Sequence, residues 1–257
     1  MGSATAILVA VRVAGLPSPR LRGRIEEYWA IERDLRDVGG RFSITPDMYV
    51  EIIIWASRVT VVDGARRQRV TPCMFIGLLD RPIVIEANEI VRCAAIRLPA
   101  WAKSAVLTRA DHSAPWGDAS PTFPGLANRV VPLVRARRWP DIWDAFDSAL
   151  SRPLVVAPRP ERGGVGRRQR ERRTRAATGM SPLQLANLER FQRARDSLWL
   201  HPDKPLGQLA SDLGYADQAH FTRHFRRYAG MPPRVFLQEL ARLRGVANVQ
   251  DVTAPAK

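Results

Sequence analysis

Chemically reactive side chains are scarce in this sequence of 257 residues. It has two cysteines and four histidines, and residues 1–111 contain no histidine. Two cysteines are too few for a disulfide framework or a four-cysteine zinc site, so we expect Cys73 and Cys93 to be small buried side chains. A histidine-based metal site in the first 111 residues is excluded because its ligands are missing. We therefore expect neither a metal nor a cofactor.

Motifs of the common enzyme classes are also missing. The sequence has no glycine-rich phosphate loop, no His-Glu-x-x-His and no Gly-x-Ser-x-Gly. His112, beside Asp111, has no placed serine or cysteine with which to form a catalytic triad, which favours a loop histidine. Asp47 and Glu51 offer carboxylates that could bind a ligand amine, but a turn aspartate and a strand-edge glutamate are the simpler interpretation. We expect no catalytic residues and no enzymatic activity.

Long apolar runs are absent as well. A membrane-spanning helix needs about 18 to 20 apolar residues. The best candidate, residues 4–16, carries Arg12 and has no basic residue ahead of it, so it fits neither a membrane span nor a secretory signal. We expect a cytoplasmic protein without a membrane partner.

Lysine is rare, whereas positive charge is abundant. The 40 basic residues exceed the 25 acidic ones by 15, yet only three of them are lysine. Residues 151–257 carry +11 of this excess, and eight arginines lie between Arg159 and Arg175. A run this dense is either a solvated face or a surface that faces phosphates. The balance favours a polyanionic partner such as double-stranded DNA.

Two hydrophobic patterns divide the chain into a β-rich and a helical part. Short apolar runs separated by turns predict an antiparallel β-sandwich or barrel in the first part. These runs are Tyr49–Trp55, Val59–Val62, Met74–Leu79, Ile83–Ile85 and Ile90–Ile96. Helical spacing predominates after residue 151. The expected helices cover Leu183–Leu198, Leu206–Leu213, Gln218–Tyr228 and Val235–Leu243. The fold class is therefore α+β with two domains.

A self-similarity of about 51 residues lies in the basic part. Residues 175–182 match residues 226–233, and in each copy a glycine ends one helix and a proline begins the next. Met180 and Met231, which follow these glycines, are most simply core residues. In the second copy, a short helix and a turn through Gly214 lead to a helix that Asp217 can cap.

The helix after Asp217 has two distinct faces. Its aromatic residues fall together on a face that we expect to be buried, namely Phe221, Phe225 and Tyr228. Polar and small residues fall together on another face, namely Gln218, Ala219, Thr222, Arg223 and Arg226. Two short helices joined by a tight turn, with such groups outward, are typical of a major-groove reader. Arginine can bond guanine, glutamine can bond adenine, and alanine or the threonine methyl can touch thymine.

The stretch from Leu209 to Arg227, followed by Gly230-Met-Pro-Pro233, resembles the signature of the AraC family of bacterial transcription regulators. The resemblance covers residues 151–243 and implies an all-α domain with two helix-turn-helix units joined by a linker helix. Through Pro46-Asp47, residues 51–53 and residues 75–82, the β-rich part resembles the domain of uncharacterised function that precedes some AraC-type domains. It departs from that pattern at Met48-Tyr49, where the family has Gly-Cys.

These observations give a domain plan and a function. We expect a cupin-like β-domain for sensing or dimerisation in residues 1–110, a helical connector in 111–150, the AraC-type domain in 151–245 and a flexible tail in 246–257. The function is a sequence-specific DNA-binding transcription regulator. A small-molecule effector, RNA polymerase and a second copy of the chain are further possible partners. Two alternatives stay open: a regulator that binds DNA weakly and acts through a protein partner, and an enzyme with its site in the β-domain.

The second helix-turn-helix unit supplies the expected DNA contacts. The predicted base-reading residues are Gln218, Ala219, Thr222 and Arg223, and the predicted backbone contacts are His220, Arg226, Arg227 and Arg234. His220 could equally be a packing residue, and His224 is expected to pack at the edge of the helix.

The first unit, about residues 156–178, is degenerate by comparison. It replaces three apolar residues of the first helix by Arg159, Pro160 and Gly163, and adds Pro158. In the recognition helix, Arg170 and Thr174 stand where the second unit has Phe221 and Phe225. We expect a loosely packed unit that contacts mainly the DNA backbone, through Arg167, Arg168, Glu171, Arg172 and Arg175.

Overall fold

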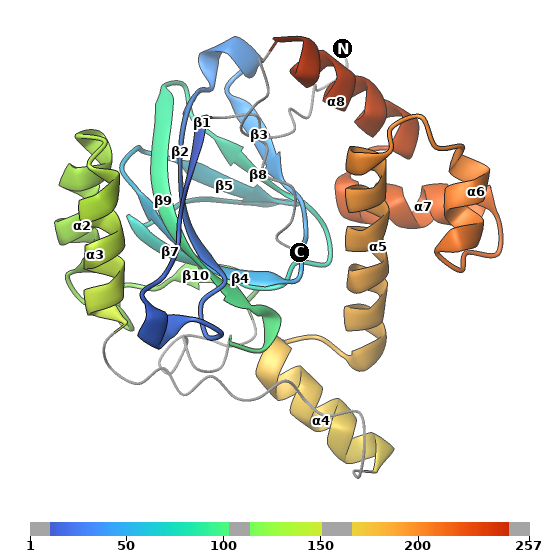
Figure 1. Ribbon diagram of the computed structural model, residues 1–257, viewed down its shortest axis with the longest axis horizontal. Coiled ribbons are helices and arrows are strands. Elements are labelled where there is room, and N and C mark those ends of the chain that lie inside the picture. The colour runs from blue at the N-terminus through green and yellow to red at the C-terminus, as the bar shows by residue number, and fades with distance from the viewer. Residues whose placement is uncertain (1–10, 103–113, 151–165, 247–257) are drawn as a thin grey trace.

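The chain folds into a β-rich part and a helical part that lie side by side (Figure 1). The computed structural model describes residues 11–102, 114–150 and 166–246. The expected fold class, an α+β fold with an antiparallel β-rich N-terminal part and an all-α C-terminal part, is confirmed.

Two antiparallel sheets form the β-rich part. The six-stranded sheet has the order β1 (Val11–Gly15), β2 (Glu27–Asp34), β9 (Ile90–Pro99), β4 (Tyr49–Trp55), β7 (Cys73–Ile76), β10 (Trp116–Asp118). The four-stranded sheet has the order β3 (Arg41–Ile44), β8 (Ile83–Glu86), β5 (Thr60–Asp63), β6 (Arg66–Arg69). Short 3-10 helices η1 (Pro19–Leu21), η2 (Arg36–Val38) and η3 (Ala100–Ala102) flank them.

Both faces of the six-stranded sheet are covered. Side chains alternate along β4, so that Ile53 and Trp55 face the second sheet while Ile52 and Ile54 face a helical layer. A strand buried on both faces is apolar at nearly every position, which is why Tyr49–Trp55 was recognisable as a strand. By contrast, β6 is exposed along its whole length and has no apolar pattern, so the sequence did not reveal it.

The helical layer comes from the segment expected to be a connector. Helices α2 (Leu126–Arg135) and α3 (Trp139–Ala149) cover the six-stranded sheet (Figure 1), and β10 pairs with β7. Val130 and Phe146 are fully buried in the same core as the strands. Residues 114–150 therefore pack as part of the β-rich region; the apolar helix face was visible in the sequence, but its partner was not.

The helical part contains five described helices. They are α4 (Arg167–Thr178), α5 (Pro182–Leu200), α6 (Leu206–Asp212), α7 (Gln218–Ala229) and α8 (Pro233–Val246). Gly179 and Gly230, which end α4 and α7, have φ of 78° and 76°, and Pro182 and Pro233 begin the next helices. The predicted stop and start signals are confirmed. None of the described helices is both long and apolar enough to cross a membrane.

A third hydrophobic cluster joins the two parts. Leu78 and Ala100 of the β-rich part are buried together with Phe191 and Phe225 of the helices. Polar contacts accompany this packing: the Met48 amide donates to Gln192 Oε1 at 2.9 Å. The helical part is therefore held against the β-rich part by apolar burial and by hydrogen bonds between side chains of α5 and the backbone at Pro46 and Met48.

Gly230 lies at this junction and allows a matched test with Gly214. Both have positive φ, of 76° and 71°, but a Cβ on Gly230 would lie 3.2 Å from Pro82 Cγ, whereas one on Gly214 meets nothing within 4 Å. Alanine costs roughly 1 to 2 kcal/mol in this conformation. We expect Gly214→Ala to lose about this much, and Gly230→Ala to lose more because Pro82 must move. Urea unfolding midpoints measure the difference. Equal losses of stability in the two variants would show that Pro82 moves aside without cost.

Candidate nucleic-acid interface

The turn between α6 and α7 is fixed by backbone geometry and by a cap. Gly214 adopts a left-handed conformation after α6, and Asp217 precedes α7. The Asp217 Oδ1 atom accepts the His220 amide at 2.6 Å, which satisfies one of the free N–H groups of the first turn. The predicted cap is confirmed, and it defines where the N-terminus of α7 begins.

The inner face of α7 is locked by aromatic packing. Phe221, Phe225 and Tyr228 are at most 2% exposed, as the helical spacing predicted. The Phe191 ring of α5 lies 5.2 Å from the ring centres of both Phe225 and Tyr228. Aromatic pairs at this distance favour a defined mutual geometry. Because one face is fixed, the direction of the opposite face is fixed too.

That opposite face carries the predicted base-reading side chains. Gln218, Ala219 and Arg223 are exposed, and no ion pair joins Arg223 to another residue that the structure describes. Thr222 is half-buried, and its hydroxyl donates to the Gln218 carbonyl at 2.8 Å. The hydroxyl hydrogen of Thr222 is thus used within the helix, which leaves its methyl group for an apolar contact.

The predicted backbone contacts lie around this face. Arg226 and Arg234 are exposed. Arg227 is 60% exposed, and its Nη2 atom lies 3.9 Å from Asp80 Oδ2 of the β-rich part. His220 is half-buried with its ring edge-on to Tyr215, 5.4 Å between ring centres. The arginines are accessible to a ligand, whereas the His220 ring also packs.

His224 packs at the edge of α7, as expected. Its Nδ1 atom lies 2.9 Å from the Tyr215 hydroxyl oxygen. Burial, with the positive charge of Arg190 next in weight, lowers the pKa of His224 to about 4. At neutral pH the imidazole is therefore uncharged and contributes packing and a hydrogen bond rather than a cation.

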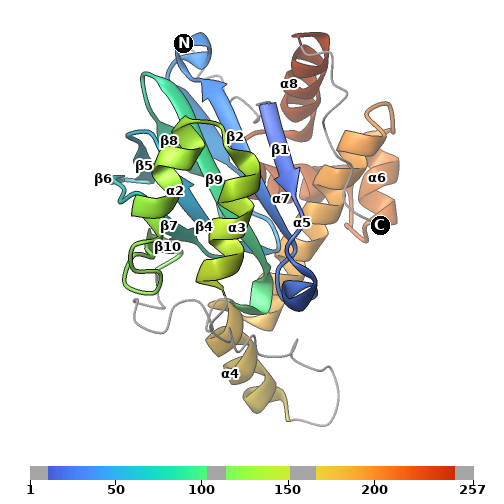
Figure 2. The same ribbon diagram turned by 60° about the vertical axis from the view of Figure 1, so that its left-hand side comes forward.

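Helix α4 of the first unit differs from α7 because it exposes many arginines and buries no aromatic side chain among the residues that the structure describes. Of residues 156–178, the structure describes only 166–178, so Pro158, Arg159, Pro160 and Gly163 lie outside it. The exposed side chains of α4 include Arg168, Arg170, Glu171, Arg172, Arg173 and Arg175, while Arg167 begins the helix. Its buried side chains are Thr174 and Thr178. In both views α4 extends away from the other helices (Figures 1 and 2).

The carboxylates singled out in the β-rich part are structural. Asp47 Oδ1 accepts the Tyr49 amide at 3.0 Å, which confirms a turn aspartate. Glu51 is not at a sheet edge, because β4 lies between β9 and β7. It is buried, accepting from Trp29 Nε1 at 3.0 Å and from Arg97 Nη2 at 2.7 Å. The sequence could not show this, since the partners come from other strands.

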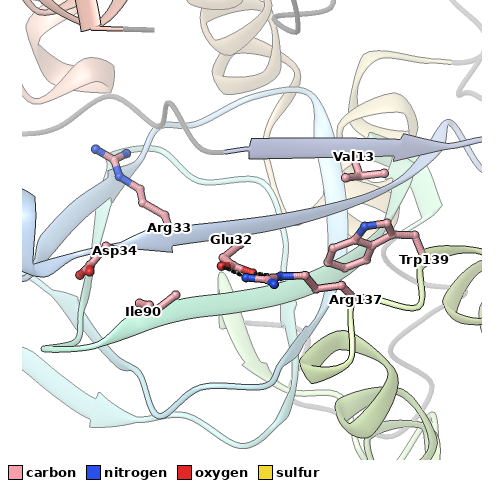
Figure 3. A pocket seen from close by; sticks show the side chains of 7 residues that line it. All are labelled: Val13, Glu32, Arg33, Asp34, Ile90, Arg137 and Trp139. Carbon is pink, nitrogen blue, oxygen red and sulfur yellow. Dashed lines mark hydrogen bonds and ion pairs between the residues drawn. The ribbon is translucent and has the colours of Figure 1, made fainter.

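A charged pocket lies on the outer surface of the β-rich part (Figure 3). Glu32 forms ion pairs with Arg137 at 2.6 Å and with Arg92 at 3.0 Å. The hydrogen bond from Arg137 has the largest effect on the pKa of Glu32 and that from Arg92 the next largest, and together they lower it to about 2. Val13 and Trp139 supply apolar walls. The sequence did not predict this pocket, because its lining residues come from β1, β2, β9 and around the start of α3 and meet only in the folded chain.

The remaining reactive side chains have ordinary roles. Cys73 and Cys93 are buried free thiols, and burial raises the pKa of Cys73 to about 12. Within the three described segments, no group of three or more His, Cys, Asp or Glu residues could hold a metal ion. Asp111 and His112 lie outside the described residues.

Residues 161–239 match a family model described as a helix-turn-helix domain. No curated protein matches the sequence of this chain. One similar solved structure is ToxT from Vibrio cholerae with a bound unsaturated fatty acid (11% identity, 86% of this chain and 98% of that chain covered, TM-score 0.46). Two others are the AraC-like transcriptional activator CuxR (11%, 92% and 87%, TM-score 0.28) and a Cupin_2 domain of an XRE-family transcriptional regulator from Enterobacter cloacae (11%, 34% and 95%, TM-score 0.26).

The family match confirms the helix-turn-helix domain that the stretch from Leu209 to Arg227 led us to expect. It supports a DNA-binding transcription regulator as the broad class of this chain. The roles of the individual side chains on α7 and α4 stay predictions.

The buried His224 predicts a pH dependence of stability. Its pKa is about 4 in the folded state, against an ordinary value near 6.5, so the unfolded chain takes up the proton first as the pH falls. We expect the contribution of His224 to the unfolding free energy to be fully present above pH 6.5 and to be lost as the pH falls from 6.5 to 4. His224→Gln should reduce that decline, measured by urea unfolding at several pH values. An unchanged slope in the variant would contradict this.

Proposed function

We propose that this chain, in which residues 161–239 form a helix-turn-helix domain of the AraC type, is a sequence-specific DNA-binding transcription regulator. The observation that carries the proposal is the geometry of α7. One face of this helix is fixed by buried aromatic rings, and the other presents Gln218, Ala219 and Arg223 to the outside. A short helix held in this way after a tight turn suits insertion into the major groove.

Base recognition follows from the chemistry of these side chains. The Arg223 guanidinium can donate to O6 and N7 of guanine, and the Gln218 amide can pair with N6 and N7 of adenine. Ala219 and the Thr222 methyl group suit the thymine methyl. All four positions lie in the first half of α7, the part of a recognition helix that contacts base edges.

Phosphate contacts orient this helix on the duplex. Arg226 and Arg227 extend from the second half of α7, and Arg234 lies in the first turn of α8. His220 supplements them from the first turn of α7. Contacts of this kind raise the affinity for every sequence and carry no base information.

Helix α4 serves a different purpose in this proposal. Its exposed arginines are suited to phosphates and poorly suited to discrimination between bases. α5 has 19 residues and is therefore about 28 Å long. A linker of that length suits two units on successive turns of the DNA, with base specificity in the second unit alone.

The β-rich part is proposed to modulate DNA binding, as a sensor of a small molecule or as a dimerisation domain. The space between its two sheets is filled by large buried side chains such as Trp29, Trp55 and Trp116. An effector therefore has to act on another surface or displace this packing. A titration of the DNA complex with candidate metabolites tests the role as a sensor. The mass of the chain in solution tests the role in dimerisation. RNA polymerase is a further proposed partner.

The function is tested by DNA binding with two arginine variants. A gel shift on the upstream region of the chain's own gene should show specific binding. Arg223→Ala should cost roughly 1 to 3 kcal/mol and relax the preference at one base pair, because a base contact is lost. Arg227→Ala should weaken all sequences alike and reduce the salt slope by about one.

The two variants control for each other, since both remove one guanidinium from α7. An unaltered base preference in Arg223→Ala would show that the faces are assigned wrongly. Absence of any sequence-specific binding by the unmodified chain would favour a regulator that acts through a protein partner.

A footprint tests the inequality of the two units. Sharp base dependence should cover one major-groove segment, where α7 binds, and the neighbouring turn should be protected but tolerant of base changes. The reason is that the exposed side chains of α4 are mainly arginines, which suit phosphates and discriminate poorly between bases. Systematic base substitution across the protected region measures this. Equal base dependence in both segments would contradict the assignment.

A further inference from the structure

Helix α4 lacks the residues that anchor its counterpart. By the repeat of about 51 residues, Phe221, Phe225 and Tyr228 of α7 correspond to an exposed arginine, a threonine and an alanine of α4. Nevertheless, Thr174 and Thr178 are only 5% and 2% exposed. Side chains outside α4 therefore cover this face of the helix.

One element that lies beside α4 belongs to the β-rich part. η3 (Ala100–Ala102) lies directly beside α4, and Ala100 is 1% exposed. Ala100 belongs to the same hydrophobic cluster as Met180, which follows α4, and Trp101 packs against that cluster. A turn of the β-rich part thus lies beside α4 and belongs to the hydrophobic cluster that the chain enters at Met180, directly after α4.

The buried threonines are compatible with this close packing. Thr178 Oγ1 donates to the Thr174 carbonyl at 2.8 Å and accepts the Met180 amide at 3.1 Å. The hydroxyl is therefore satisfied although it is buried. These bonds join the last turn of α4 to Met180, the residue that enters the hydrophobic cluster.

η3 is attached to a firmly held strand. It follows β9 directly, and Arg97 near the end of β9 donates from Nε to Glu51 at 2.9 Å and from Nη1 to Glu27 at 2.9 Å. Burial opposes the charge of Arg97, but Glu51 and the neighbouring carboxylates outweigh it and raise the pKa of Arg97. β9 also pairs on both sides, with β2 and β4. η3 therefore continues from a strand that is paired on both sides and joined to two carboxylates.

We propose that η3 of the β-rich part is the structural support of α4, in place of the aromatic core that the first helix-turn-helix unit lacks. Trp101 and Ala100 are then positioning residues: they determine where the arginines of α4 lie without touching a ligand. The consequence for DNA rests on the proposed function, since it requires those arginines to bind phosphates. The support itself does not depend on DNA and can be measured without it.

Amide hydrogen exchange on the full chain, without DNA, tests the support. Trp101→Ala should accelerate exchange in residues 170–178 of α4 by about tenfold or more, while residues 221–229 of α7 keep their protection. Trp199→Ala is the matched control, because Trp199 packs on the same cluster from α5. It should leave α4 as in the unmodified chain. Trp101→Leu removes less of the side chain and should give a smaller acceleration, which guards against a variant that fails to fold.

Unchanged exchange in α4 for both Trp101 variants would overturn the proposal, as would an equal acceleration by Trp199→Ala. Salt-dependent DNA binding then examines the consequence. Trp101→Ala should lower the salt slope by about one or more and leave base preference unchanged. If exchange responds and the salt slope does not, the support stands and the role of the α4 arginines in DNA binding is wrong.

Discussion

The packing of Phe191 of α5 against Phe225 and Tyr228 of α7 is the contact on which the proposed nucleic-acid interface depends. A helix of 12 residues is marginal by itself and is stabilised by burying one face. Once three aromatic side chains fill that face, rotation of the helix would expose them to water. The directions of Gln218 and Arg223 follow from this burial, and no interaction of their own is required to hold them outward.

The two copies of the repeat show the same local signals with different support. Gly179 and Gly230 end their helices in the same left-handed conformation, so helix boundaries survive in both copies. Only α7 buries aromatic rings against its own unit, whereas α4 buries two threonines and lies beside η3 of the β-rich part. The helix boundaries in this chain are therefore set by residues close in sequence, while the burial of each helix depends on what it packs against.

The β-rich part connects these features. Both faces of its main sheet are covered, one by the second sheet and the other by α2 and α3. Its third contact is with the helical part, through Leu78, Ala100 and the backbone at Met48. The charged cluster around Arg97 lies on the strand that leads to this contact. The region that we expect to sense a small molecule or to dimerise thus also packs directly against the helical part.

The sequence by itself determined the features that depend on near neighbours: the apolar run of β4, the stop and start residues around Gly230, the cap at Asp217 and the two faces of α7. Periodicity and turn chemistry act within a few residues, so they are legible without a structure. Only the tertiary structure decided the features that join distant segments. These features are the place of Glu51 in an inner strand, the packing of residues 114–150 on the sheet and the contact of η3 with α4. They depend on which surfaces meet, and an apolar pattern in the sequence shows that a face is buried but not which segment covers it.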